Sequence, residues 1–340
     1  MSFSVRRGTN VSHWLSQSKR RGAERRAFFT QADVRRIADW GFDHIRLPID
    51  EQQMWDDAGQ PEPEAFDLLD AALDWAQSAG LRVIVDLHIL RSHYFMDASP
   101  PLFTDPAEAQ KFADLWRQLS RHLNRRCEDH VAYELMNEPV AIDDEDWNRV
   151  AHIAFTAIRE LEPTRIIVLG SNKWSQCITF DELRVPEDKR QLLTFHFYNP
   201  MFITHYKAGW TDAGKYTGPV HYPGVQVKDE DIRGLPEDVL AVVKKYNCEY
   251  GRPQMVQAIA KPLAVRKQTG LPLYCGEFGV IHNTPMPLRL AWYRDLISVF
   301  NEHDIAWANW DYKGGFGLVD GEGKPTGIVE AMLGWQDASL

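Results

Sequence analysis

Apolar and polar positions along this chain follow two patterns that succeed one another repeatedly. Short apolar runs, such as Leu81 to His88 with Val83-Ile84-Val85 at its centre, are typical of strands buried on both faces, which are common in parallel sheets. Between them lie longer segments in which apolar residues recur every three or four positions, as in amphipathic helices. The alternation predicts strands joined by helices, and therefore an α/β fold with a parallel sheet.

Eight strands are expected from this pattern, and a helix follows almost every one. No glycine fingerprint for a dinucleotide and no phosphate-binding loop follows the first strand, which disfavours an open doubly wound sheet. We therefore predict a closed (β/α)8 TIM barrel. The expected strands are Ser4 to Val11, His44 to Pro48, Leu81 to His88, Val131 to Glu138, Arg165 to Ser171, Gln191 to Tyr198, Leu273 to Gly276 and Ile305 to Tyr312. The first expected helix follows the N-cap Thr30, the third begins at Asp105-Pro106, and the last is a short helix after Pro325. The other expected helices are Glu64 to Ala79, Asp144 to Leu161, Glu237 to Tyr246, Gln254 to Gln268 and Leu288 to Glu302.

The chain of 340 residues shows no linker, internal repeat or low-complexity segment. We therefore expect residues 1–340 to form one catalytic domain, a length that is normal for a barrel with insertions. The alternation is interrupted after strand six by residues 201–235, which are rich in Gly, Pro, Tyr and Trp. We expect an irregular insertion there, and long loops of this kind are usually functional.

Charge and composition exclude several classes of partner. The formal net charge is −10, so binding to a nucleic-acid backbone is not expected. Basic residues do cluster between positions 6 and 26, but the Ser, Gly and Glu residues among them predict a solvated surface loop. No apolar run approaches the length of a membrane span. The absence of a signal-peptide core fits a cytoplasmic protein or a secreted one whose signal was removed.

Polar side chains recur at the carboxyl ends of the predicted strands. In a barrel these ends face the active site, so residues far apart in the sequence would converge on one pocket. Any one of them has a structural explanation, such as a salt bridge or a packed ring, but the recurrence favours a site. The set comprises Arg46, His88, Asn137, Glu138, His196, Tyr198, Glu277 and Trp310.

Two of these residues suggest a chemistry. Glu138 and Glu277 follow the fourth and seventh strands, and glycoside cleavage requires one carboxylic acid to protonate the leaving oxygen and one carboxylate to meet the oxocarbenium-like centre. A separation of about 5 Å between the carboxyl groups predicts a retaining mechanism with a covalent intermediate, whereas about 8 Å leaves room for water and inversion. We expect Arg46 to keep Glu277 ionised. No metal or other cofactor is expected for this reaction.

The ordered motifs resemble glycoside hydrolase family 5, the cellulase family of clan A. They include Asn-Glu-Pro at 137–139, Gly-Glu-Phe-Gly at 276–279, Ile-Arg-Leu-Pro around Arg46, Asp-Leu-His at 86–88 and His-Phe-Tyr at 196–198. Trp310 and the opening segment Gly8 to Leu15 complete a likeness that spans nearly the whole chain. Ser12-His13 departs from the small glycines that are frequent in that family, so His13 would narrow the cleft beside the cleavage point.

The resemblance implies a role for each residue of the set. Glu138 would be the acid/base and Glu277 the nucleophile of a retaining O-glycosyl hydrolase. Asn137 would bind the sugar 2-hydroxyl, and His196 would lie beside the acid/base. The roles implied for the others are contact with the nucleophile for Arg46 and Tyr198, hydroxyl binding for His88, and stacking under the sugar ring for Trp310.

Substrate choice is less constrained than the chemistry. A β-1,4-glucan cleaved by an endoglucanase is the leading hypothesis, and β-mannanase, exo-acting β-glucosidase or β-1,3-glucanase action remain alternatives. A non-catalytic sugar-binding barrel and a metal-dependent enzyme using His88, His93, His196, His205 or His282 are alternatives of other classes, but no two of these histidines, nor the four cysteines, have zinc-type spacing. Aromatic faces stack on sugars, and Trp174 is the strongest candidate among Trp14, Trp55, Tyr94, Trp174 and Trp210. The sequence indicates no oligomeric state.

Overall fold

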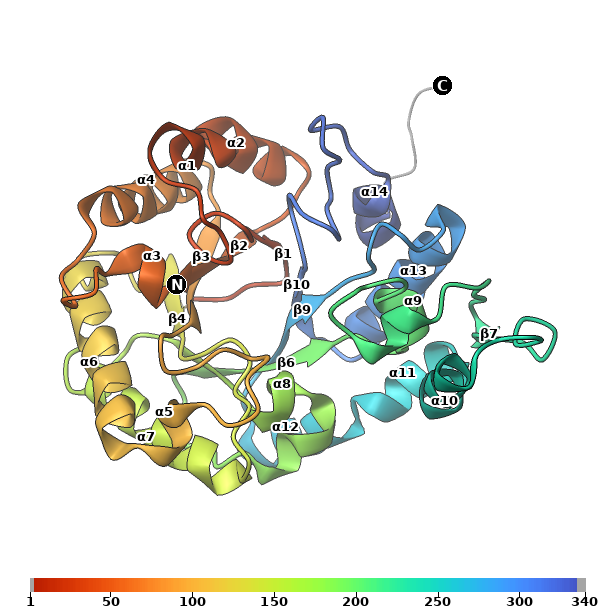
Figure 1. The fold of residues 1–340 in the computed structure, drawn as a ribbon. Helices are drawn as coiled ribbons and strands as arrows, with labels where there is room; N and C mark the ends of the chain where they lie inside the picture. Colours follow the sequence, from red (N-terminus) through yellow and green to blue (C-terminus); the bar gives the residue numbers. More distant parts are fainter. Residues whose placement is uncertain (1–2, 335–340) are drawn as a thin grey trace. The chain divides into compact units, whose positions relative to one another are not determined.

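The protein is described from a computed structural model that covers residues 3–334. Eight parallel strands close into a barrel in the order β1-β10-β9-β6-β5-β4-β3-β2 (Figure 1). Their bounds are β1 (Arg7–Asn10), β2 (His44–Asp50), β3 (Arg82–Ile89), β4 (Val131–Glu134), β5 (Ile167–Gly170), β6 (Gln191–Phe197), β9 (Leu273–Phe278) and β10 (Ala306–Asn309). The predicted (β/α)8 barrel is confirmed.

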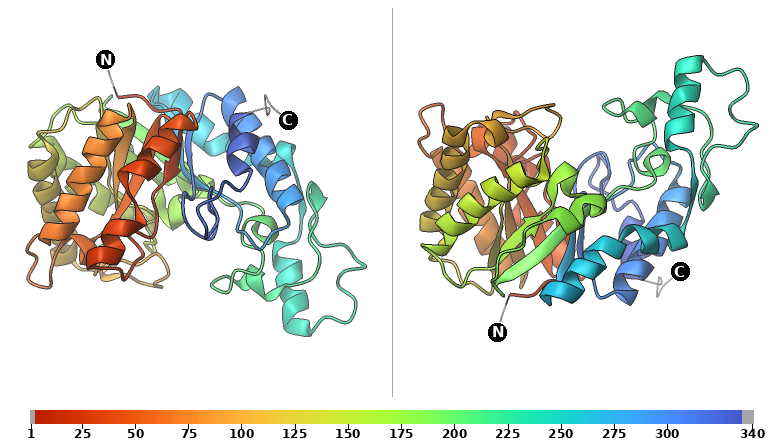
Figure 2. Two further views of the ribbon diagram at one scale, coloured as in Figure 1. Left: turned by 90° about the horizontal axis from the view of Figure 1, so that it is seen from above. Right: turned by 90° about the horizontal axis from the view of Figure 1, so that it is seen from below.

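The chain divides into two compact units. The barrel unit comprises residues 3–196, 261–276 and 306–308. It therefore holds all of β1 to β5, and all but the last one or two residues of β6, β9 and β10. Its helices α2, α4, α6 and α7 lie outside the ring of strands (Figure 2). The bounds in this unit are α1 (Gly22–Phe28), α2 (Gln31–Asp39), α3 (Glu51–Met54), α4 (Pro63–Ser78), α5 (Pro101–Thr104), α6 (Pro106–Leu123), α7 (Asp144–Arg159), α8 (Asn172–Ser175), η1 (Cys177–Glu182) and α12 (Ala260–Thr269).

The second unit comprises residues 197–260, 277–305 and 309–334. It includes the predicted irregular segment 201–235, in which only short elements form. A two-stranded antiparallel sheet pairs Gly224 with Tyr250. The elements are α9 (Met201–Thr204), η2 (Asp212–Lys215), β7 (Gly224–Val225), α10 (Glu237–Tyr246), β8 (Glu249–Tyr250), α11 (Arg252–Ala258), α13 (Met286–Glu302) and α14 (Ile328–Leu333). None of the helices in residues 3–334 combines the length and apolar character needed to cross a membrane.

Local sequence signals account for several helix boundaries. Thr30 begins α2, and its backbone N–H donates to the Asp33 carboxylate at 2.9 Å, which satisfies one of the orphan donors at a helix start. Asp105 accepts from the N–H of Ala107 at 2.8 Å to begin α6. The predicted helix Gln254 to Gln268 is instead two helices, α11 and α12, because Pro262 lacks an N–H and its ring would clash with the carbonyl four residues earlier.

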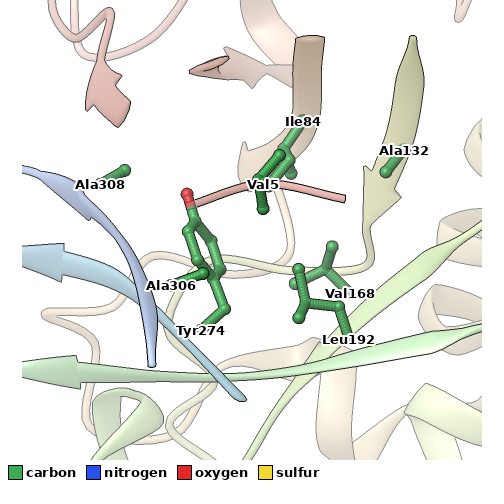
Figure 3. Close-up of a cluster of buried hydrophobic side chains, with 8 residues drawn as sticks. All are labelled: Val5, Ile84, Ala132, Val168, Leu192, Tyr274, Ala306 and Ala308. Carbon is green, nitrogen blue, oxygen red and sulfur yellow. The ribbon is translucent and has the colours of Figure 1, made fainter. Parts of the chain in front are cut away.

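The floor of the barrel is an apolar cluster contributed by the strands and the segment before β1 (Figure 3). Since side chains alternate along a strand, residues two positions apart point to the same face. The positions two residues beyond Ile84 and Ala132 are Asp86 and Glu134, so the next layer toward the carboxyl ends of β3 and β4 is charged. The apolar cluster comprises Val5, Ile84, Ala132, Val168, Leu192, Tyr274, Ala306 and Ala308.

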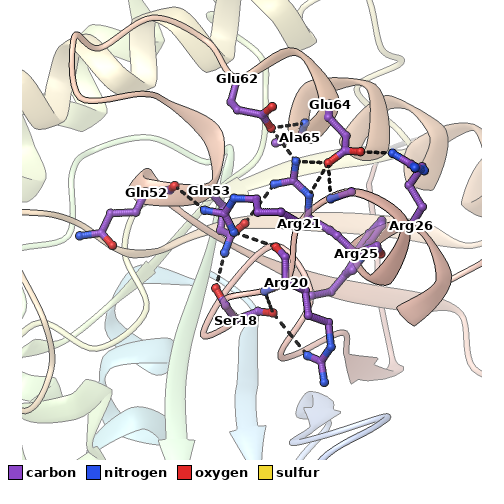
Figure 4. A network of polar contacts seen from close by, with 12 residues as sticks. Ser18, Arg20, Arg21, Arg25, Arg26, Gln52, Gln53, Glu62, Glu64 and Ala65 are labelled. Carbon is purple, nitrogen blue, oxygen red and sulfur yellow. Dashed lines mark hydrogen bonds and ion pairs between the residues drawn. The ribbon is translucent and has the colours of Figure 1, made fainter.

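The basic segment near the N-terminus is only partly the solvated loop predicted from its composition. Lys19, Arg21 and Arg26 are exposed, but α1 begins at Gly22 and Arg25 on this helix is 0% exposed. Arg25 donates to Glu62 at 2.7 Å and to Glu64 at 2.5 Å, and its Nη1 donates to Gln53 at 3.1 Å (Figure 4). A buried guanidinium requires such partners, and they follow β2 in the chain, so composition could not indicate them.

Candidate active site

Arg46 on β2 lies at the centre of a buried polar layer inside the barrel unit. Its Nε and Nη2 donate to the two oxygens of Glu134 at 2.7 and 2.9 Å, and Nη2 lies 3.0 Å from Asp86 Oδ2. All three side chains are 0% exposed. Burial raises the pKa of Asp86 and of Glu134 to about 7, while the Arg46 charge opposes the increase. The single Arg46 guanidinium therefore contacts two carboxyl groups, and both keep their protons to a higher pH than exposed carboxyl groups do.

The same guanidinium orients two asparagines. Nη1 of Arg46 donates to Asn10 Oδ1 and Nη2 donates to Asn137 Oδ1, both at 2.9 Å. Because Asn137 Oδ1 accepts from Arg46, its amide N–H₂ is directed away from the guanidinium. The Ser175 hydroxyl donates to the Asn137 carbonyl at 2.9 Å and holds the main chain immediately before Glu138.

His88, near the end of β3, is 1% exposed and uses both ring nitrogens. Nδ1 lies 2.6 Å from Asp86 Oδ2, and Nε2 lies 2.8 Å from the Gln17 side-chain nitrogen. Since the carboxylate accepts at Nδ1, Nε2 is the acceptor for the Gln17 amide. His88 is therefore tied both to the Arg46 layer and to the loop after β1.

The candidate acid, Glu138, lies four residues after the end of β4 and has a side chain 13% exposed. Its Oε1 is 2.8 Å from His196 Nδ1. Burial holds the pKa of His196 well below its ordinary value, helped by the nearby charge of Arg46, so this imidazole is neutral. A neutral imidazole can accept a hydrogen bond from a carboxylic acid or donate one to a carboxylate. The pair is therefore compatible with a group that alternates between acid and base.

Gly276 lies close to the side chain of Thr194. A Cβ at position 276 would lie 2.8 Å from Thr194 Oγ1, closer than a normal contact, but at an ordinary contact distance of 3.4 Å from His196 Nε2. The Gly276 carbonyl also accepts from the Asn10 amide at 2.9 Å, which ties β9 to β1.

The candidate nucleophile, Glu277, belongs to the second unit and is 4% exposed. The Tyr198 hydroxyl donates to Glu277 Oε2 at 3.0 Å. A phenol that donates to a carboxylate stabilises its negative charge. The Tyr198 ring itself packs edge to face against His205, with 5.1 Å between centroids, and against Phe316, at 6.1 Å.

Trp310 also belongs to the second unit and is 8% exposed. Its backbone N–H donates to the Phe278 carbonyl at 2.8 Å. A Cβ at Gly279 would lie 2.2 Å from the Trp310 carbonyl, so only glycine permits the two segments to approach this closely. The motif Gly-Glu-Phe-Gly thus supplies Glu277 together with the main chain that holds Trp310.

The predicted aromatic positions differ in their surroundings. Trp174 is 40% exposed, and its Nε1 donates to the Phe95 carbonyl at 2.8 Å. Tyr94 is 41% and Trp210 55% exposed, so these three remain candidates for sugar contact. Trp14 and Trp55 are buried at 0% and 1% exposure, so these two candidates are packing residues. Large apolar rings gain most by such burial, and each indole N–H finds an internal acceptor, Arg25 O or Gln118 Oε1.

Three residues of this region were missed in the sequence, namely Gln17, Asp50 and Glu134. The strand was expected to end at Pro48, whereas β2 continues to Asp50 and thus adds this carboxyl group to the strand end. Glu134 could have been recognised as a buried functional residue because it is the one charged side chain in the apolar run before Asn137. Nothing in the local sequence marks Gln17. His13, a predicted substrate contact, is half-buried with φ 57°, and its Nδ1 lies 3.5 Å from the Gln17 carbonyl.

Solved structures of other proteins share the barrel fold of this chain. A structure described as a hyperthermophilic endo-β-1,4-glucanase in complex with substrate has a TM-score of 0.77, with 21% identity and 97% of each chain covered. A structure of Thermotoga maritima Cel5A in complex with mannotriose has a TM-score of 0.78, with 23% identity and coverage of 96% of this chain and 97% of that one.

Sequence relatives give the family. "Endoglucanase C" of Acetivibrio thermocellus is 33% identical over 317 residues, covering 91% of this chain and 92% of the relative. "Cellodextrinase A" of Ruminococcus flavefaciens is 29% identical over 311 residues, covering 90% and 84%. The model of the family described as Cellulase (glycosyl hydrolase family 5) matches residues 7–315. The chain therefore belongs to glycosyl hydrolase family 5 and is an O-glycosyl hydrolase.

Proposed function

We propose that this protein is a retaining endo-β-1,4-glucanase in which Glu138 is the acid/base and Glu277 the nucleophile. The observation that carries the proposal is that each carboxyl group has a different partner. Glu138 lies against a neutral imidazole, whereas Glu277 accepts from a phenol. Different surroundings are what allow two carboxyl groups to take different protonation states at one pH.

The proposed reaction has two steps. In the first, the Glu277 carboxylate attacks the anomeric carbon while Glu138 gives its proton to the glycosidic oxygen, and the leaving sugar departs as an alcohol. In the second, the Glu138 carboxylate takes a proton from water, the water oxygen bonds to the anomeric carbon, and Glu277 is released. Retention requires the two carboxyl groups to be about 5 Å apart. The substrate assignment is supported by the endoglucanase relative that matches over nearly the full length.

The test of the mechanism is chemical rescue. Glu277→Ala should reduce turnover of an aryl β-cellobioside to background, and azide should restore product as the α-glycosyl azide, because azide replaces the missing nucleophile. Glu138→Ala should lose about 10²- to 10⁴-fold on substrates with poor leaving groups, retain activity on activated ones, and yield the β-glycosyl azide. Glu182→Ala, which changes an exposed glutamate of η1, is the matched control and should behave like the unmodified protein.

The test of the substrate is a panel of hexasaccharides. Cellohexaose should be cleaved internally, with cellobiose, cellotriose and cellotetraose appearing together, and faster than mannohexaose or laminarihexaose. Release of glucose alone would indicate exo action instead. Full activity in Glu277→Ala would overturn the assignment of the nucleophile, and binding of cellohexaose without cleavage would favour a sugar-binding barrel.

A further inference from the structure

The loop after β1 places an unassigned side chain against a candidate sugar-binding residue. Gln17 directs its amide nitrogen to His88 Nε2 at 2.8 Å, and its backbone N–H donates to Asp50 Oδ2 at 2.7 Å. His88 lies on β3 and Asp50 ends β2, so the three residues come from neighbouring positions of the barrel, β1, β2 and β3. All three belong to the barrel unit.

The contact changes what His88 can offer to a ligand. Nδ1 of His88 is held by Asp86 and Nε2 by Gln17, so a hydroxyl group approaching Nε2 would meet the Gln17 amide. Gln17 has one further N–H, and its Oε1 accepts no hydrogen bond from the residues that the structure describes. A donor and an acceptor held side by side match two neighbouring hydroxyl groups of a sugar ring.

Asp50 is a second buried polar group beside Gln17. It is 7% exposed, and within residues 3–334 its Oδ1 makes no hydrogen bond of normal geometry, although the Ser16 hydroxyl is close enough to lower the pKa of this carboxyl. Burial nevertheless raises the pKa of Asp50 to about 6, against the effects of His88, Ser16 and Gln17. The Oδ1 atom is shielded from solvent, so Asp50 acts through its contact with the Gln17 N–H and positions that residue.

The loop holds Gln17 in a strained conformation. Gln17 has a backbone φ of 49° and His13 one of 57°, values that residues other than glycine rarely adopt. Such residues persist where the surroundings determine them, and they cluster at functional sites. Arg20 donates to the His13 carbonyl at 2.9 Å, and Gln53 donates to the Ser18 carbonyl. Gln53 also accepts from Arg25, so the buried network of Figure 4 anchors this loop.

We propose that Gln17 is a specificity-determining residue whose side-chain amide, positioned by His88 and Asp50, binds two adjacent hydroxyl groups of one sugar ring. The inference rests on the proposed glycosidase function and adds a contact to the same site. The ligand class is an unsubstituted β-linked glucosyl unit, because a side branch on either hydroxyl would meet the anchored loop. His88 then acts mainly through Gln17, as the acceptor that orients the amide.

The experiment measures the value of each hydroxyl separately. Aryl β-cellobiosides in which one hydroxyl of the glycosyl ring next to the scissile bond is replaced by hydrogen are compared in the unmodified protein, Gln17→Ala and Gln17→Gly. Glycine tolerates the left-handed backbone, so this second variant separates side-chain loss from added strain. In the unmodified protein, removal of the hydroxyl that Gln17 binds should lower kcat/KM about tenfold or more, since a site built for a hydroxyl rejects the analogue lacking it.

The expected result is that both variants lose this particular penalty while keeping the penalties at the other hydroxyls. A purely structural role would lower kcat/KM for all analogues by the same factor. Gln52→Ala, an exposed glutamine after the same strand as Asp50, is the control and should keep every penalty. Unchanged penalties at all positions in the Gln17 variants, in a protein that cleaves the parent glycoside and loses this activity in Glu277→Ala, would overturn the inference while leaving the proposed function intact.

Discussion

The polar layer around Arg46 allows a quantitative test of how this barrel tolerates buried charge. Arg46→Met removes the only cation that the structure shows, within residues 3–334, between Glu134 and Asp86. Removing one partner of a buried ion pair leaves an uncompensated charge and typically costs about 3–5 kcal/mol. We expect a loss of that size in the free energy of unfolding of the barrel, measured by urea denaturation at pH 7.

The sign of the pH dependence follows from the same contacts. Arg46 lowers the pKa of both carboxyls, which burial raises to about 7. The guanidinium therefore stabilises the folded state most where the carboxyls are ionised, above pH 7, and least where they are protonated. The cost of Arg46→Met should fall as the pH is lowered from 8 to 5.

A double-mutant cycle separates the pair from the rest of the layer. Glu134→Gln keeps the shape of the side chain, and Arg46→Met combined with Glu134→Gln removes both charges. Because the residues are in direct contact, the double variant should be less destabilised than the sum of the two single variants, by about 0.5–3 kcal/mol. A cost below about 1 kcal/mol for Arg46→Met, or strict additivity, would refute the view that the guanidinium balances these carboxyls.

Two further predictions concern a candidate catalytic contact and a buried histidine. Tyr198→Phe removes the hydrogen bond to Glu277, and since a bond to a charged group contributes about 1.5–3 kcal/mol, kcat/KM for an aryl cellobioside should fall about 10- to 150-fold; an unchanged value would show that the hydroxyl is dispensable. Burial lowers the pKa of His93 to about 3, against about 6.5 in the unfolded chain, so protonation of the unfolded chain lowers the free energy of unfolding as the pH falls from 6.5 toward 3. At pH 4.5 this decrease should be about 3 kcal/mol. In His93→Gln the free energy of unfolding should therefore change less between pH 7 and 4.5, and an identical change in both proteins would contradict this.

Much of the architecture follows from local sequence. Buried strands without alternation, such as Leu81 to His88, and capped helices, such as the one that begins after Thr30, are encoded within a dozen residues, and the structure confirms both. The strand ends were less well predicted. β4 ends at Glu134 although apolar residues continue to Met136, and β2 runs beyond Pro48 to Asp50, because pairing with the neighbouring strand and not hydrophobicity decides where a strand ends.

The sequence by itself determined the barrel and the side chains that its strand ends would carry, because alternation and chain order depend only on neighbouring residues. The pairings that give those side chains their properties depend on tertiary structure. The neutral imidazole beside Glu138, the burial of Arg25 and the contact of Gln17 with His88 each join residues at least 28 positions apart. Burial and partner choice are properties of the folded chain, and they decide which carboxyl is protonated and which amide faces the ligand.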